Sequence, residues 1–256
     1  MTSEKWKVRS TSSTFTHHVV STLLYILALA VATTAQERKP QNKPYIDLRP
    51  MHFGISVGFN TQDIEFQNVG PQLVTLEDGT TTTETVVCDQ DNWNPGFSVG
   101  VLAEMRLNNH LAFRVIPSMH FGTRNVTFMN HTNGEREHQI LKSTFISIPL
   151  DVKFSAERFN NYRPYLVAGV NPMYDLTVKR GKELLLKPFD CYLEIGMGCD
   201  FYLPFFKCIP EIKFAYGLAN VINKNRSDLT NPDQLVYTDA ISRGHSKMII
   251  LSLYFE

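Results

Sequence analysis

Five of the eight histidines are the side chains of this 256-residue sequence best suited to proton transfer or metal binding, because imidazole titrates near neutral pH and ligates transition metals. No G-x-S-x-G or H-E-x-x-H motif accompanies them, and the four cysteines show neither C-x-x-C nor metal-ligand spacing. All except His120 fall in expected loops or at strand ends. We therefore expect no enzyme, metal or cofactor, and surface or packing roles for His110, His120, His131, His138 and His245.

Nine charged residues form a second candidate set, because they alternate with apolar residues along expected β-strands. Successive side chains of a strand point to opposite faces, so these charges share a face with glycine and serine. Small residues mixed with charges of both signs suit the narrow interior of a barrel. Unpaired buried charges cost several kcal/mol each, so the acidic and basic groups must compensate one another. We expect a structural charge network in a barrel interior, made of Glu104, Arg106, Arg114, Asp151, Lys153, Glu194, Asp200, Glu211 and Lys213.

The elements that position these charges are eight expected strands. The stretch MHFGISVGFN shows the pattern, since Phe53, Ile55, Val57 and Phe59 alternate with small or polar residues. Most of the strands reach the about 9–11 residues that a tilted strand needs to cross a bilayer. We find no amphipathic helix of useful length. The strands are expected at 52–60, 94–107, 111–121, 145–154, 162–175, 189–202, 205–217 and 246–256.

The connections between these strands alternate in length. Three are short, at 108–110, 155–161 and 203–204, and four are long, at 61–93, 122–144, 176–188 and 218–245. Outer-membrane barrels have short periplasmic turns, long external loops and usually an even strand count. The sequence therefore predicts an all-β fold, an eight-stranded antiparallel up-and-down transmembrane β-barrel whose apolar rows face lipid. Directly opposed residues of a hairpin share a face, so Leu107 must pair with Leu111.

Three prolines conflict with regular strands. Pro117, Pro149 and Pro210 fall inside expected strands, and a closed barrel has no edge strand to accommodate them. We expect bulges or local breaks there; strands that ended at the prolines would instead favour a smaller periplasmic sandwich. A turn at Leu203-Pro204 would place Cys199 opposite Cys208, which allows either a cross-strand disulfide or two free thiols.

The N-terminal region is typical of an exported protein. Basic residues precede an apolar run, Val19 to Ala32, which is shorter than the roughly 20 residues of a spanning helix. We expect a signal peptide at 1–35, cleaved between Ala35 and Gln36, then an extended, proline-rich periplasmic arm at 36–50, and the barrel at 51–256. The expected location is the outer membrane.

Charge and barrel size exclude several functions. The 25 basic and 25 acidic residues balance, so there is no basic surface for nucleic acid. An eight-stranded barrel is only wide enough for its own side chains, which excludes a simple porin. Loop 61–93 is acidic without Lys or Arg, whereas loop 176–188 is mainly basic. These loops are either solvated surfaces, or they clasp each other or a partner.

Four stretches resemble the PorT family of outer-membrane β-barrel components of the bacterial type IX secretion system. They are YIDLRPMHFGISVGFN, YRPYLVAGVNPMYDL, DFYLPFFKCIPEIKFAYGLANVI and the C-terminal LSLYFE. The similarity extends from about Asp47 to the end and is weakest in loops 61–93 and 122–144. None of the stretches is a catalytic motif.

The resemblance implies a role in exporting proteins that carry C-terminal sorting domains. Because the barrel is narrow, we expect an accessory or assembly subunit whose partners are outer-membrane lipid and other secretion-system subunits, with no small-molecule substrate identified. Asp47, Arg49, Pro50 and Phe53 are the candidate partner contacts, unless they only fix the entry of the chain into the barrel. The alternatives are a stand-alone structural or adhesive barrel, a lipid-modifying barrel enzyme, and a soluble lipocalin-like binder.

Overall fold

The computed structural model describes residues 40–75, 81–90, 94–130, 134, 136–177, 185–224 and 240–256. The predicted signal peptide lies outside these residues. Gln41–Glu256 forms one compact unit. Its strands are β1 (Met51–Asn68), β2 (Pro71–Thr75), β3 (Thr81–Gln90), β4 (Asn94–Arg106), β5 (Leu111–Val115), β6 (Ser118–Asn130), β7 (Arg136–Ser147), β8 (Leu150–Ser155), β9 (Tyr162–Asp175), β10 (Phe189–Tyr202), β11 (Lys207–Gly217) and β12 (Ile241–Phe255). Within the described ranges, no helix has the length and apolar character needed to span a membrane.

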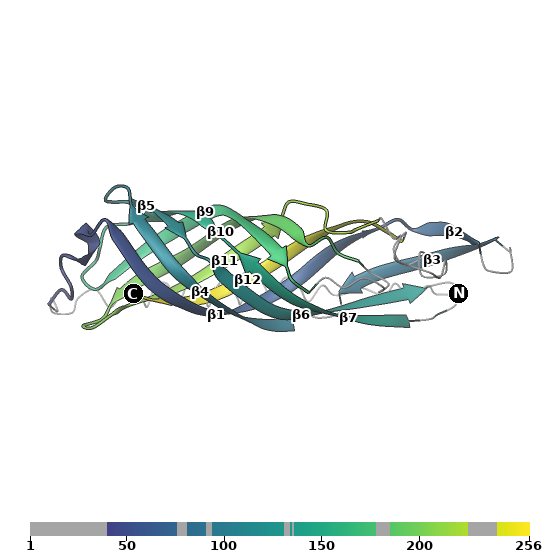
Figure 1. Cartoon of the computed structure of the whole chain (residues 1–256), viewed down its shortest axis with the longest axis horizontal. Helices are drawn as coiled ribbons and strands as arrows, with labels where there is room; N and C mark the ends of the chain where they lie inside the picture. The colour runs from purple at the N-terminus through teal and green to yellow at the C-terminus, as the bar shows by residue number, and fades with distance from the viewer. Residues whose placement is uncertain are drawn as a thin grey trace, which may run out of the picture. The chain divides into compact units, whose positions relative to one another are not determined.

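Eight antiparallel strands close into a ring (Figure 1). The order is β1, β4, β5, β8, β9, β10, β11 and β12, and pairing of β12 with β1 completes the circle. Nearer the long connections, β6 and β7 take the places of β5 and β8, because β6 pairs with β4 and β7 pairs with β9. The predicted eight-stranded antiparallel barrel is confirmed.

The prolines interrupt the strands, as expected. Pro117 divides the predicted strand 111–121 into β5 and β6, and Pro149 divides 145–154 into β7 and β8. Pro210 remains inside β11, whose pairing with β12 continues through Pro210 and Leu253. Its pairing with β10 is interrupted there without a change of register, between Gly198↔Glu211 and Phe201↔Cys208. A missing N–H thus removes local pairing without ending the barrel.

Two of the three short turns lie where the sequence places them. The backbone N–H of Leu107 donates to the Leu111 carbonyl at 3.0 Å, as the face argument requires. The turn between β10 and β11 is longer than expected and covers 203–206. It therefore sets Cys208 opposite Phe201 rather than opposite Cys199, and all four cysteines are free. The disulfide alternative is wrong because this longer turn shifts the register.

Two of the predicted long loops are mostly strand, which corrects the sequence prediction. β1 continues to Asn68 and is followed by β2 and β3, while β6 and β7 form a hairpin within 122–144. We call this region the outer lobe: β1 from Asp63, β2, β3, the β6–β7 hairpin, the start of β12, and segments 185–187 and 220–223. Its buried core is apolar and consists of Ile64, Val86, Cys88, Val126, Phe128, Leu186, Val221, Ile222, Ala240 and Ile241.

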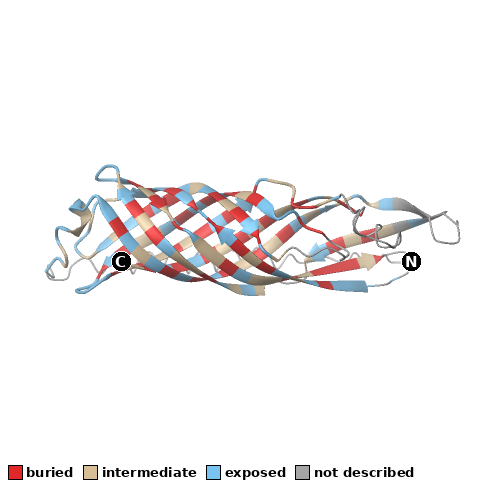
Figure 2. Ribbon diagram, in the orientation of Figure 1, coloured by how far each residue is buried: buried red, intermediate tan, exposed pale blue. Residues whose placement is uncertain are grey.

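The polarity of the two strand faces inverts along β1. From Met51 to Phe59, the outward residues are apolar and exposed, and the inward residues are polar or small (Figure 2). Beyond this row, Asp63 and Glu65 point outward and Ile64 is buried. The apolar row matches the about 9–11 residues of a membrane-crossing strand. The outer surface of the barrel proper therefore suits contact with lipid, and the outer surface of the lobe suits contact with water.

The outer lobe has its own closure and charge pairing. The Asn68 side chain accepts from the Cys88 N–H at 2.9 Å and donates to its carbonyl at 3.1 Å, and Gln90 bonds the backbone of Gln62 and Ile64 in the same way. The acidic residues of β1 lie beside basic residues of β12, since Asp63 pairs with Lys247. Asp63 and Glu65 of the acidic stretch 61–93 therefore lie beside Lys247 of β12. Residues 178–184 of the basic loop lie outside the described residues.

Candidate functional site

The candidate site is a network of charged and hydroxyl side chains in the barrel interior. It lies beside two buried apolar clusters, one that includes Leu102, Val167 and Ile209 and one that includes Phe145, Met173 and Ile250. Its members come from all eight strands of the ring, because every second residue of each strand points inward. The structure buries all the predicted interior charges except Arg106, which is half-buried at the short-turn end and donates to Asn109.

Arg114 is the centre of the network. Its guanidinium is fully buried and donates to Glu104 at 2.7 Å and to Glu211 at 2.6 Å. The Tyr165 and Tyr254 hydroxyls donate to Glu211 at 2.5 and 2.8 Å, and the Arg114 Cζ lies 4.8 Å from the centre of the Tyr165 ring. Charge-assisted hydrogen bonds of this kind are stronger than neutral ones.

Glycine on the inner face makes room for this packing. A Cβ at Gly198 would lie 2.5 Å from Tyr165 Cζ and 2.7 Å from the Pro210 carbonyl oxygen, which no real Cβ tolerates. Tyr165 reaches Glu211 because residue 198 has no side chain. This is the physical use of the small residues that the sequence places beside the charges.

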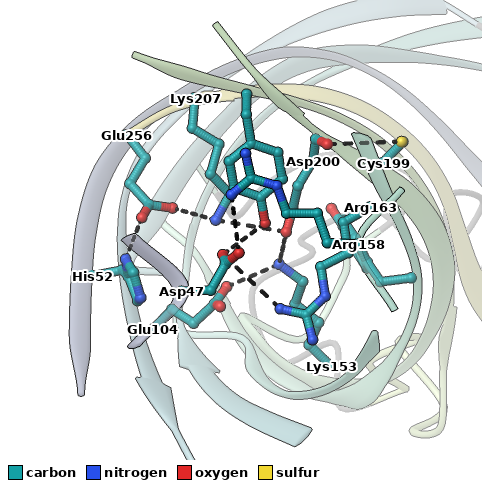
Figure 3. A network of polar contacts seen from close by, with 12 residues as sticks. Asp47, His52, Glu104, Lys153, Arg158, Arg163, Cys199, Asp200, Lys207 and Glu256 are labelled. Atoms are coloured by element: carbon teal, nitrogen blue, oxygen red, sulfur yellow. Dashed lines mark hydrogen bonds and ion pairs between the residues drawn. The ribbon is translucent and has the colours of Figure 1, made fainter. Parts of the chain in front are cut away.

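A second group of charges lies toward the short-turn end (Figure 3). Lys153 Nζ contacts Asp200 at 2.8 Å and Glu104 at 3.3 Å, which joins this group to Arg114. Lys207 Nζ lies 3.5 Å from Asp200 and 2.9 Å from Glu256. His52 Nδ1 contacts the other side of the Glu256 carboxylate.

Lys213 connects the opposite end of the network. Its Nζ lies 2.5 Å from Asp151, 3.3 Å from Glu194 and 3.6 Å from Glu211, and Asn171 donates to Glu194 at 2.5 Å. Two polar cavities border the network, and each has a volume of about 20 Å³. A single water needs about 10–15 Å³, so neither cavity accommodates a sugar or a polypeptide.

The N-terminal segment Gln41–Pro50, which we call the strap, closes the short-turn end. Asn42 bonds the Asn161 side chain at 2.8 Å and the Tyr202 carbonyl at 2.9 Å, whereas the Pro50 carbonyl accepts from Arg106 of β4 at 2.9 Å. β1 and β9–β10 are on opposite sides of the ring, so the strap crosses the barrel mouth. It is not fully extended, because Ile46–Leu48 form one turn of 3₁₀-helix.

Asp47 fixes the strap over the mouth. Its carboxylate accepts from the Tyr202 hydroxyl at 2.6 Å and from Arg158 at 3.3 Å, and lies 4.0 Å from Arg163 (Figure 3). The Arg158 guanidinium also stacks on the Tyr202 ring at 3.6 Å. Of the four candidate partner contacts, Asp47 thus bonds residues of its own chain.

The other three candidate contacts differ in their surroundings. Phe53 lies on the lipid-facing wall, while Arg49 and Pro50 are exposed on the strap. The sequence analysis missed His52, Lys207, Glu256, Tyr165 and Tyr254 as network members. Face parity would have identified them, since four occupy inward positions of their strands and Glu256 directly follows β12 in the same alternation.

The histidines do not gather into a site. His120 contacts Ser147 Oγ at 3.0 Å, His110 contacts the Ser155 carbonyl, His138 contacts Thr127, and His245 contacts the Gly217 carbonyl. His131 lies outside the described residues. No cluster of potential metal ligands occurs in the part of the chain that the structure describes.

Comparison with known families identifies the fold. Residues 34–223 match the model of the outer membrane protein beta-barrel domain. The chain belongs to this family. Members of an outer-membrane barrel family contact membrane lipid, so this domain lies in the outer membrane with its apolar wall against lipid. Barrels of this class generally keep their short turns in the periplasm, and the strap lies at the short-turn end of this barrel.

Solved structures similar to this barrel domain are distant. OprG from Pseudomonas aeruginosa is 13% identical with a TM-score of 0.45, covering 86% of this chain and 96% of its own. Neisserial surface protein A (NspA) is 11% identical with a TM-score of 0.42, covering 80% and 98%. Ail from Yersinia pestis is 13% identical with a TM-score of 0.33, covering 81% and 99%. No curated protein gives a significant match.

Proposed function

We propose that this barrel is a non-enzymatic accessory subunit of a type IX protein secretion machinery, needed for the export of proteins with C-terminal sorting domains. The observation that carries the accessory role is the filled interior. Arg114 joins β5 to β11 on the opposite side of the ring, Lys213 joins β11 to β8, and Lys153 joins β8 to β10. The two polar cavities beside these ion pairs are the size of a water molecule. Cargo has no path through such a barrel, so the protein acts through its surfaces.

The positions of the PorT-like stretches support the secretion role. They fall on the strap and β1, on β9, on β10 and β11, and at the end of β12. These five strands are neighbours in the ring, in the order β9–β10–β11–β12–β1. The stretches that resemble the secretion component thus form one continuous side of the barrel together with the strap that covers its periplasmic mouth.

Gene deletion tests the proposal. In a strain that lacks this protein, cargo with a C-terminal sorting domain is expected to accumulate in the periplasm, and the same cargo without that domain serves as the control. Arg114→Met with Glu104→Gln and Glu211→Gln, which keeps the interior filled, is expected to restore export. Normal surface display of the cargo in the deletion strain would refute the secretion role.

A stand-alone structural or adhesive barrel is the second candidate. The outer lobe favours it, because strands that continue past the membrane on an apolar core form a rigid external platform. Removing the β6–β7 hairpin tip separates the two functions. An adhesive barrel would lose binding to its surface target and leave cargo export unchanged.

A further inference from the structure

The strap exposes apolar side chains, whereas the carboxylate of its acidic residue, Asp47, points into the barrel mouth. Tyr45 is 77% exposed and Leu48 is 63% exposed, on either side of the inward-pointing Asp47. Phe205, in the β10–β11 turn that follows Tyr202, is 89% exposed at the same end. Large apolar side chains that protrude together at a protein end mark an interaction surface more often than isolated ones do.

The position of the strap argues against lipid as the occupant of this surface. Tyr45 and Leu48 lie between the two anchors of the strap, Asn42 beside β9 and β10 and Pro50 beside β4. They therefore lie across the mouth of the ring, whereas lipid covers the wall. Figure 3 shows Asp47 inside the circle of strands, which places the strap over the lumen.

The charge of the strap defines the partner further. Between residues 40 and 50, the charged residues are Lys43, Asp47 and Arg49. Asp47 is taken by Tyr202 and Arg158, and Arg49 is exposed. The outward face of the strap is therefore apolar and cationic, and a complementary surface needs an apolar recess with carboxylates at its rim.

We propose that the strap is the docking site for a periplasmic protein subunit with such a recess, with Tyr45 and Leu48 as anchors and Arg49 as the charged contact. This inference rests on the proposed secretion role and names the class of partner through which that role is exerted. Aromatic and arginine anchors that enter a pocket account for most of the binding energy of protein interfaces.

The test is photo-crosslinking in intact cells with the full-length chain. A photoreactive amino acid at position 48 is expected to give one protein adduct, and this adduct is expected to disappear with Arg49→Glu. The matched control is position 107, because Leu107 is 58% exposed at the same end but in the β4–β5 turn at the wall, where lipid adducts are expected. The adduct supports the inference only if deletion of the captured protein also stops cargo export.

The contribution of the two anchors to binding is measured with the variant Tyr45→Ala plus Leu48→Ala, in which only exposed side chains are changed. Recovery of the partner with the purified complex is expected to fall at least about tenfold, the size expected for the loss of two interface anchors. Lipid adducts at position 48, an adduct with a second copy of this chain, or no adduct would each overturn the inference.

The two proposals fail in different ways. If the deletion strain exports cargo normally, the secretion role fails whatever the strap contacts. If deletion stops export but the Tyr45→Ala plus Leu48→Ala variant exports at the wild-type rate, the secretion role stands and the docking site is wrong.

Discussion

Along β1, the inward residues change from His52, Ser56 and Asn60 in the barrel to Ile64 and Phe66 in the outer lobe, while the outward residues change from phenylalanine and valine to Asp63 and Glu65. One strand thus belongs to two structures with opposite polarity. In the barrel, apolar side chains gain little by burial because lipid is outside, so the interior holds the charged groups beside two small apolar clusters. In the lobe, water is outside and the usual hydrophobic core returns.

The comparison shows that the two regions draw stability from different sources. The barrel interior combines paired charges, each of which is costly without its partner, with two small apolar clusters. The lobe interior depends on close packing of Val86, Phe128 and Ile222. Alternation alone gives the same β-strand in both regions, and the solvent decides which face becomes the core.

The largest expected effect is loss of the central charge. Arg114→Met leaves Glu104 and Glu211 buried without their main partner and is expected to cost about 3–5 kcal/mol, measured by urea unfolding in lipid vesicles. Adding Glu104→Gln and Glu211→Gln should recover much of this loss. In the lobe, Phe128→Ala should cost about 3–5 kcal/mol through an unfilled cavity. A triple variant no more stable than Arg114→Met would show that charge pairing does not explain the barrel interior.

The next effect tests where the membrane ends. Ile55 and Ile140 are both outward-facing and 60% exposed, the first on the barrel wall and the second in the lobe. Ile55→Arg is expected to cost about 2–4 kcal/mol in vesicles, because it places a charge in lipid. Ile140→Arg should change stability by less than about 0.5 kcal/mol. Equal costs at both positions would mean that lipid also surrounds the lobe.

A smaller effect concerns the closure of the lobe by side chains. Asn68→Ala removes both hydrogen bonds to the Cys88 backbone and should cost the lobe about 1–3 kcal/mol. Burial raises the pKa of the Cys88 thiol, so alkylation of Cys88 reports local opening. With the other cysteines replaced by serine, the variant should react faster while the barrel remains folded. The neighbouring, outward Gln67→Ala is the control and should leave the rate unchanged.

The smallest effect is pH-dependent. The hydrogen bond from Lys247, at 2.7 Å, lowers the pKa of the Glu65 carboxyl, and Glu65 raises the pKa of Lys247. The contribution of Glu65 is present above its unfolded pKa of about 4.3 and is lost as pH falls through the lowered folded value. The contribution of Lys247 is present below about pH 10.4 and is lost as pH rises through its raised folded value. Amide exchange of the lobe should differ between wild type and Lys247→Gln at pH 7 and converge near pH 3.

The barrel could be predicted from sequence because its signals are local. Period-two alternation identified the walls, and face parity fixed the Leu107–Leu111 pair. The outer lobe was missed for a physical reason. Beyond Thr61, the alternation continues with inverted polarity, and the acidic residues of 61–93 resemble a solvated loop.

The site could be predicted only in part. Formal charge marked Arg114, Lys153 and Glu211, but the two tyrosines that complete the network carry no charge and resemble packing residues. The sequence identified an N-terminal arm but not its course across the barrel mouth, because the contact between Asp47 and Tyr202 joins residues 155 positions apart. Such contacts depend on ring closure, which alternation does not encode.

Pro117 lies in the break between β5 and β6, Pro149 in the break between β7 and β8, and Pro172 within β9. Each of their carbonyls accepts a hydrogen bond from a neighbouring segment: Pro117 from Val101, Pro149 from Ile116 and Pro172 from Ile148. Since proline contributes no N–H, this oblique line has fewer cross-links than the sheet on either side of it. A force that pulls on the lobe should therefore part the wall along this line first. The lobe would then deform under load while the membrane-embedded ring keeps its shape.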